Sequence, residues 1–286
     1  HEYIAFAKLG EQLKSDIVYL ELLGQKIIVL NSAEIVSEIM EKRSALYSDR
    51  PPIPMVTDPT LMNWSSLPTM TGYNDLWRHY RRILNNWLNA RAVTQFDDLQ
   101  ERQARLLLRR LLGATDQAQA FERVRNEFYF GVHQPSITSS LLQDHTLLLG
   151  LSTMEKEERV KEVGFTMFGG GTDTSAGFLV NLVAAMVSNP HAQAIAQQEL
   201  DTVLGQGVLP SITDKERLPY IRNLIDEVFR LYPVIPLGRK DSAGKEVLPQ
   251  IELERNSLML ELKPFDFELK PRSDAHYRLI TGTIDE

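Results

Sequence analysis

The sequence predicts a mainly α-helical fold with small β-sheets, on three observations. Segments with apolar residues at helical spacing cover most of the 286 residues. Strand-like alternation is confined to residues 17–30 and 264–270. The composition, 43% hydrophobic and 24% charged, is that of an ordinary globular protein with enough residues for a sizeable core.

The first part of the chain predicts a hairpin, a helix and a loop. Two apolar stretches within residues 17–30 flank a turn at Gly24, which is a hairpin pattern. Ser32 is placed to cap a helix that runs through Met40. From residue 51 to residue 72, proline, methionine, threonine and serine replace any periodic pattern, which predicts a long loop.

The central part predicts three helices. They span Asp75–Asn89, Phe96–Leu112 and Glu155–Val187, and the last of them is interrupted by a glycine-rich motif. Residues 113–120 form a weakly patterned junction, and residues 121–143 mix signals. No element is predicted for these two stretches.

The last part predicts two further helices and a strand. Pro190 suits the first turn of a helix over His191–Leu204. Thr213–Glu216 has the spacing of a capping box, and Leu218–Tyr232 is the next helix. The alternation of residues 264–270 is typical of a strand-like tail.

Charge and cysteine content exclude several classes of function. The net charge of −7 and the absence of a basic stripe argue against nucleic-acid binding. The chain contains no cysteine, which excludes disulfides, thiolate zinc sites and cysteine nucleophiles within it. It begins at His1 without the layout of a signal peptide, and no apolar run is long enough to span a bilayer.

The motif at residues 168–175, Phe-Gly-Gly-Gly-Thr-Asp-Thr-Ser, lies inside the longest predicted helix. A phosphate-binding loop would need a strand before the glycines, and the flanking residues are helical instead. A close helix crossing at small residues is a second interpretation. The third is a loosened turn that lets a flat ligand lie against the backbone, beside hydroxyls and one carboxylate.

Several motifs of the sequence resemble motifs of cytochrome P450 enzymes and occur in the same order along the chain. Gly170–Ser175 is similar to the oxygen-activating helix motif [Ala/Gly]-Gly-x-[Asp/Glu]-Thr-[Thr/Ser] of that family. Glu227–Arg230 resembles its Glu-x-x-Arg helix, and residues 77–81 resemble its Trp-x-x-x-Arg helix. Residues 264–273 resemble the carboxyl end of fungal microsomal members.

The resemblance implies a haem site with named positions. Trp77 and Arg81 would bond a haem propionate, because a guanidinium matches a carboxylate in geometry. Gly170 and Gly171 would lie against the cofactor. Tyr80 stands where many members carry histidine, so its own contact differs from theirs. The alternative for Trp77 and Arg81 is that the tryptophan packs on the core side of the helix and the arginine is solvated.

Two further pairs receive roles from the resemblance. Asp173 and Thr174 would be the catalytic pair, relaying protons above the haem, whereas the alternative is hydrogen bonding within the helix. Glu227 and Arg230 would form a buried structural network, whereas the alternative is a surface ion pair. No metal ligand is assigned, because no histidine lies in a recognisable ligand loop.

The same resemblance predicts a single P450-like domain over residues 1–286, with apparent deletions near residues 113–121 and after residue 238. The family holds its haem iron with a cysteine thiolate, and the loop that carries this cysteine has no counterpart here. The expected fold is therefore a P450 fold with internal segments missing.

Two functions follow as expectations. The first is a haem-thiolate monooxygenase that inserts one oxygen atom into a hydrophobic organic substrate, with electrons from an NADPH-dependent reductase. The resemblance to anchored members implies the endoplasmic reticulum membrane, through an anchor that this chain does not show. The alternative is a non-catalytic, P450-derived fragment that cannot ligate haem, because it has no cysteine.

Overall fold

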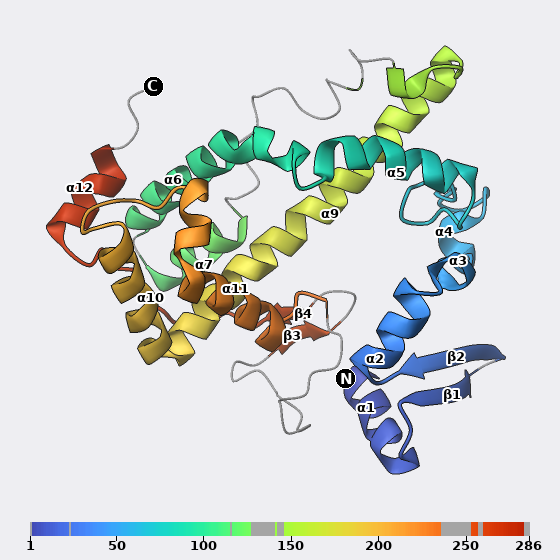
Figure 1. The fold of residues 1–286 in the computed structure, drawn as a ribbon, viewed down its shortest axis with the longest axis horizontal. Coiled ribbons are helices and arrows are strands. Elements are labelled where there is room, and N and C mark those ends of the chain that lie inside the picture. Colours follow the sequence, from blue (N-terminus) through green and yellow to red (C-terminus); the bar gives the residue numbers. More distant parts are fainter. Residues whose placement is uncertain are drawn as a thin grey trace. The chain divides into compact units, whose positions relative to one another are not determined.

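The computed structural model describes residues 2–22, 24–114, 116–126, 141, 146–235, 253–256 and 260–282. Helices dominate, and the described strands form two small antiparallel sheets (Figure 1). The chain divides into two compact units. The first comprises residues 1–89 and 135–169, and the second comprises residues 90–134 and 170–286. The mainly α fold class is confirmed.

The first unit begins with a helix and the predicted hairpin. Strand β1 pairs with β2 so that Val18 lies opposite Val29, and Gly24 makes the turn with φ +78°. A positive φ of this kind suits glycine, which has no Cβ. Ser32 caps the following helix through a 3.3 Å hydrogen bond from the Ile35 N–H. The elements here are α1 (Glu2–Leu13), β1 (Ile17–Leu22), β2 (Gln25–Leu30), α2 (Ala33–Val36), the π-helix η1 (Ser37–Glu41) and α3 (Ser44–Tyr47).

The predicted loop and helix follow. Residues 51–72 are irregular apart from α4 (Pro54–Thr57). Helix α5 (Asp75–Leu88) begins where the Asn74 side chain accepts a 3.0 Å hydrogen bond from the Trp77 N–H. This is the usual N-terminal cap of a helix.

A buried cluster holds the first unit together. It joins α5 to the first half of α9 (Thr153–Ser188) and to the 3-10 turn η4 (Thr146–Leu148). Its buried members are Tyr80, Ile83, Leu141, Leu148, Val160 and Val163. Apolar side chains at helical spacing on α5 and α9 thus meet as the sequence pattern predicts.

The second unit consists mostly of helices. Its elements are η2 (Ala92–Phe96), α6 (Asp97–Leu112), α7 (Gln117–Asn126), the second half of α9, α10 (Pro190–Val203), η5 (Ile212–Arg217), α11 (Pro219–Leu231), β3 (Leu253–Asn256), β4 (Leu260–Leu262) and α12 (Asp274–Gly282). Pro190 and Pro219 each stand in a first turn, where the missing N–H is not needed.

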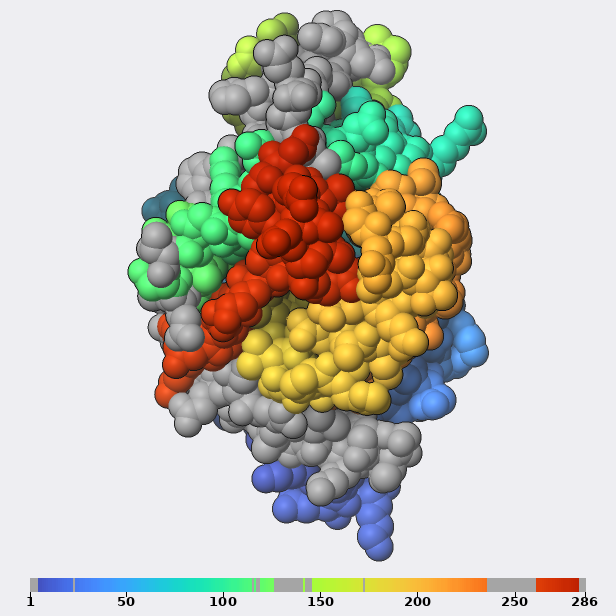
Figure 2. All heavy atoms as spheres, turned by 90° about the vertical axis from the view of Figure 1, so that its left-hand side faces the viewer, coloured from blue at the N-terminus to red at the C-terminus, as the bar shows by residue number. Residues whose placement is uncertain are grey.

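The core of the second unit lies among α7, α9 and α11. Its buried residues include Phe121, Ala184, Val228 and Phe267. The C-terminal segment lies against α10, red beside gold in Figure 2, where Arg272 binds Asp201 through two hydrogen bonds of 2.7 and 2.8 Å.

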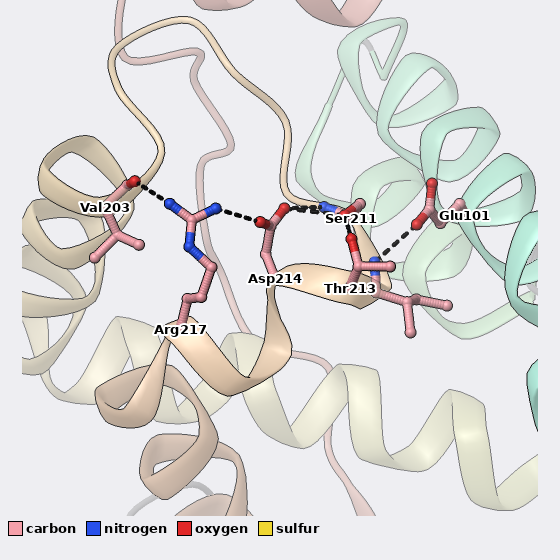
Figure 3. Close-up of polar contacts among 7 residues, drawn as sticks. Glu101, Val203, Ser211, Thr213, Asp214 and Arg217 are labelled. Carbon is pink, nitrogen blue, oxygen red and sulfur yellow. Dashed lines mark hydrogen bonds and ion pairs between the residues drawn. The ribbon is translucent and has the colours of Figure 1, made fainter. Parts of the chain in front are cut away.

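The segment before α11 is fixed by capping contacts (Figure 3). The Asp214 carboxylate accepts the Ser211 N–H at 3.0 Å, and Arg217 joins Asp214 to the Val203 carbonyl with two bonds of 2.8 Å. Glu101 of α6 accepts the Ile212 N–H at 2.7 Å. The prediction that Thr213 and Glu216 form the capping box is wrong, because Ser211 and Asp214 form it.

Two other predictions are corrected. Helix α9 runs unbroken through its glycines, so the expected interruption is absent. Residues 264–270 form no strand, since Phe265 and Phe267 pack against the core of the second unit instead. In the junction near residue 113, α6 and α7 form a hairpin in which the Arg123 guanidinium donates to the Arg110 carbonyl.

Candidate functional site

The first half of α5 presents an aromatic ring with a cation over it. Asn74 fixes the start of the helix, so Trp77 and Arg81 lie one turn apart on the same face. The Arg81 guanidinium lies 5.6 Å from the centre of the Trp77 ring. Arg81 is exposed and forms no ion pair with any residue that the structure describes. This predicted pair is therefore brought together, with its cation available to an anion.

Tyr73 also packs against the Trp77 ring. The two ring centres are 5.0 Å apart with planes tilted by 58°. The guanidinium of Arg78 lies 4.9 Å from the Tyr73 ring and forms a 2.7 Å ion pair with Asp75. The sequence analysis did not predict a role for Tyr73, although an aromatic residue four positions before Trp77 could have indicated one.

Tyr80 belongs to a buried polar network that the sequence did not predict. Its hydroxyl donates to the Glu162 carboxylate and accepts a 2.9 Å hydrogen bond from Arg159. Arg159 also pairs with Glu162 at 2.6 Å, and both side chains are largely buried. Burial, then the hydrogen bond to Glu162, raises the pKa of Tyr80. The Tyr80 hydroxyl thus joins α5 to α9 within the first unit.

His79 lies beside this network without a hydrogen bond on Nε2, which is buried. Burial, followed by the positive charges of Arg82 and Arg159, lowers the pKa of His79. Both effects favour the neutral form of the imidazole.

The glycines of α9 present an open surface. Gly169, Gly170 and Gly171 are exposed, and a Cβ added at any of them would meet no atom within 4 Å. The neighbouring Phe168 is 71% exposed, which is unusual for so large an apolar side chain. This turn of the helix can accept a flat group against its backbone.

The predicted catalytic residues follow directly on the same helix. The Thr174 hydroxyl donates a 2.7 Å hydrogen bond to the Gly170 carbonyl, which is the bond within the helix that the alternative interpretation expects. Its lone pairs are still able to accept a hydrogen bond from a ligand. Asp173 is exposed beside it.

Glu227 and Arg230 form the predicted pair on α11. Two hydrogen bonds of 2.6 Å join the guanidinium to the carboxylate and lower the pKa of Glu227. The two side chains are 49% and 44% exposed. The predicted contact is present, but burial in a larger network is not seen among the described residues.

The predicted site residues fall in both units. Trp77 and Arg81 lie in the first unit, whereas Gly170, Gly171 and the residues after them lie in the second. The described residues contain no group of three or more histidine, aspartate or glutamate side chains that could hold a metal ion.

The comparisons with known proteins agree with these motifs. A sequence model of the family described as Cytochrome P450 matches residues 133–248. Two similar proteins are from Postia placenta: cytochrome P450 monooxygenase 226, 26% identical over 83% of this chain and 60% of its own, and cytochrome P450 monooxygenase 98, 29% identical over 82% and 61%. A zebra fish cytochrome P450 solved with abiraterone covers 87% of this chain and 75% of its own, with 18% identity and a TM-score of 0.67.

The chain is similar in sequence to cytochrome P450 proteins, and its fold is similar to that of a solved member of that family. It spans about 60% of the length of the curated relatives it matches. The alignment with the first relative runs over 326 positions, more than the 286 residues of this chain. The relative therefore contains residues inside the aligned stretch that have no counterpart here.

The residues present fit a haem at its periphery but not at its iron. Arg81 offers an exposed cation for a carboxylate, and the glycines leave room beside α9. The chain has no cysteine to supply the thiolate that holds the iron in this family.

Proposed function

We propose that this chain is part of a haem-dependent monooxygenase that inserts one oxygen atom into a hydrophobic organic substrate. An NADPH-dependent reductase would supply the electrons, and the endoplasmic reticulum membrane would be its location. The proposal is supported by relatives that are named cytochrome P450 monooxygenases. No helix in the described parts of the chain is long and apolar enough to cross a bilayer.

The observation that carries the proposal is the exposed Arg81 guanidinium over the Trp77 ring. A guanidinium that has no carboxylate partner among the described residues is suited to a carboxylate from a ligand. On this proposal Arg81 holds a haem propionate, and Gly170 and Gly171 let the macrocycle approach the helix. Bound haem would supply the oxygen chemistry, since such chemistry belongs to the cofactor.

Asp173 and Thr174 are proposed to hold protons near the bound oxygen substrate. A carboxylate and a hydroxyl side by side can pass a proton between them and a ligand. The exposure of Asp173 supports this role, because its carboxylate is accessible to water.

A second candidate function rests on the missing cysteine. We infer that the 286-residue chain by itself is non-catalytic, because no thiolate can reach the iron. The activity would then require a segment that the relatives contain and this chain lacks. The proposed positions of the missing segments remain near residues 113–121 and after residue 238, within a single P450-like domain.

The absorption spectrum of the reduced, carbon-monoxide-treated protein separates the two candidates. The 286-residue chain mixed with haem is expected to lack the red-shifted Soret band of a thiolate-ligated haem. Sequencing of the transcript across the Gly238–Arg239 junction is the companion test. An in-frame segment with a cysteine loop would restore the oxygenase, whereas a continuous transcript without one would establish the non-catalytic chain.

Porphyrin binding tests the proposed periphery without requiring activity. Metal-free protoporphyrin IX has the same carboxylates as haem, and its binding near Trp77 is expected to quench tryptophan fluorescence. Arg81→Gln should weaken binding about tenfold or more, because it removes a charge-assisted hydrogen bond. The exposed Arg82, one residue further round the helix, provides the control variant Arg82→Gln. Equal affinities of the two variants would refute the assignment of Arg81.

A further inference from the structure

Asp49 fastens the chain just before α5. Its Oδ1 atom accepts a 2.8 Å hydrogen bond from the Tyr73 N–H. That bond, then the Arg50 N–H, lowers the pKa of Asp49, so the carboxylate is the form that makes the contact. A Cβ on Gly72 would come within 2.7 Å of the same Oδ1 atom. Glycine at position 72 therefore allows the carboxylate to reach the Tyr73 amide.

The contact closes the loop over residues 50–72 at its two ends. Inside the loop, the Trp64 N–H donates to the Val56 carbonyl at 2.8 Å, and the Thr71 hydroxyl donates to the Leu67 carbonyl at 2.8 Å. Leu67 and Thr71 are 8% and 3% exposed. The loop is thus folded upon itself, and its closure places Tyr73 at a fixed point before α5.

A continuous set of ring contacts leads from Tyr73 to the proposed propionate-binding side chain. The Tyr73 ring packs against Trp77 with ring centres 5.0 Å apart, and the Arg81 guanidinium lies 5.6 Å from the Trp77 ring centre. All of these residues belong to the first unit. A displacement of Tyr73 would therefore remove one side of the support of the Trp77 ring.

We propose that Asp49 is a positioning residue for Trp77 and Arg81, through its bond to the Tyr73 amide. The link between Asp49 and the Trp77 ring stands on the geometry alone, and its value for porphyrin binding rests on the function proposed above. An acceptor at position 49 and the absence of a side chain at position 72 are both required.

The three tryptophans of the chain allow this to be tested directly. In protein labelled with 5-fluorotryptophan, the fluorine resonances of Trp64, Trp77 and Trp87 report three places in the first unit. The variant Trp77→Phe assigns the resonance of interest. Asp49→Ala should shift the Trp77 and Trp64 resonances and leave the Trp87 resonance unchanged. The reason is that the variant removes the hydrogen bond to the Tyr73 N–H, which holds only the loop and the start of α5.

Two variants sharpen the test, and one serves as the control. Asp49→Asn keeps the Oδ1 acceptor and should restore most of the wild-type spectrum. Gly72→Ala should reproduce the shifts of Asp49→Ala, since its Cβ displaces the carboxylate. Asp58→Ala is the control, because the Asp58 carboxylate accepts hydrogen bonds from the N–H and the hydroxyl of Thr60, inside the same loop, and the alanine variant leaves the Asp49–Tyr73 bond in place. A Trp77 resonance unmoved by Asp49→Ala would overturn the proposal.

Porphyrin affinity then measures the consequence. Asp49→Ala should weaken protoporphyrin IX binding about three- to tenfold, a change of the size expected for one net hydrogen bond. A shifted Trp77 resonance with unchanged affinity would overturn the positioning role. If the wild-type chain bound no porphyrin, the function proposed above would fail, and the fluorine spectra would still decide the link from Asp49 to Trp77.

Discussion

Alanine at the exposed glycines of α9 should stabilise the helix. A glycine in a helix interior destabilises it by about 0.5–1 kcal/mol relative to alanine, because glycine loses more backbone entropy. At Gly169, Gly170 and Gly171 an added Cβ would meet nothing within 4 Å, so no steric cost offsets the gain. Each single substitution should therefore raise the free energy of local opening by about 0.5–1 kcal/mol.

Native-state hydrogen exchange of the α9 amides measures this change. The predicted gain corresponds to exchange that is about two- to fivefold slower around the substituted residue. Gly205→Ala is the matched control: space is equally open there, but φ is +92°. Alanine is strained at such a φ, so this variant should speed exchange at the end of α10. Faster exchange in Gly170→Ala would refute the reasoning, because it would mean that something covers that turn.

The same substitutions also test the proposed ligand. If a porphyrin lies against the backbone at Gly170 and Gly171, a methyl group there separates the macrocycle from the helix. Gly170→Ala should then stabilise the free chain and weaken protoporphyrin IX binding. Higher stability of the free chain together with weaker protoporphyrin IX binding is the result expected of a glycine that lets the porphyrin lie close to the helix backbone.

The remaining predictions concern pH. Burial and the hydrogen bond to Glu162 raise the pKa of Tyr80 above its ordinary 10.0, so Tyr80 ionises at a lower pH in the unfolded chain than in the folded chain. The contribution of Tyr80 to the free energy of unfolding should therefore be complete below pH 10.0 and decrease as the pH rises above it. Urea unfolding of Tyr80→Phe should lack this fall, and an unchanged slope would contradict the assignment. Burial and the charges of Arg82 and Arg159 lower the pKa of His79 below 6.5, so the unfolded chain binds the proton first. Stability should fall as the pH drops below 6.5, and His79→Gln should remove that loss; a loss of the same size in the variant would argue against it.

The helices that the sequence predicted are those with long, well-marked apolar stripes. Helices α5, α6, α10 and α11 lie within a few residues of their predicted spans. The short α7 and α12 were not predicted, because 10 and 9 residues give too few turns for a clear pattern. Apolar spacing also carries no signal for the π-helical turn at Ser37–Glu41.

Two errors have a physical explanation. Three glycines weaken α9 by only about 1 kcal/mol each, and the long helical flanks on both sides outweigh that cost. Residues 264–270 alternate as a strand does, yet Phe265 meets Phe121 edge-on, with ring centres 5.5 Å apart. The apolar side chains of this segment pack against side chains of helices. The sequence pattern alone does not show whether such a segment packs against helices or pairs with a neighbouring strand.

The candidate site was predictable where it depends on local spacing. Trp77 and Arg81 meet because residues four apart share a helix face. Tyr80 pairs with residues 79 and 82 positions away, and Asp49 with one 24 positions away. Contacts at such separations depend on the tertiary fold, so they cannot be predicted from the local spacing of residues in a single sequence.

The Glu227–Arg230 pair is more exposed than the family resemblance implies. At 49% and 44% exposure, water screens the two charges, and such pairs contribute about 0–1 kcal/mol. Helix α11 is held by its other face, where Val228 is buried and Asn181 donates a 2.7 Å hydrogen bond to the Tyr232 carbonyl. Burial is what the family resemblance implies for this pair, and a covering segment would have to provide it. The structural contribution of the motif therefore depends on residues beyond the motif, and the proposed haem ligation would likewise need a cysteine that this chain does not contain.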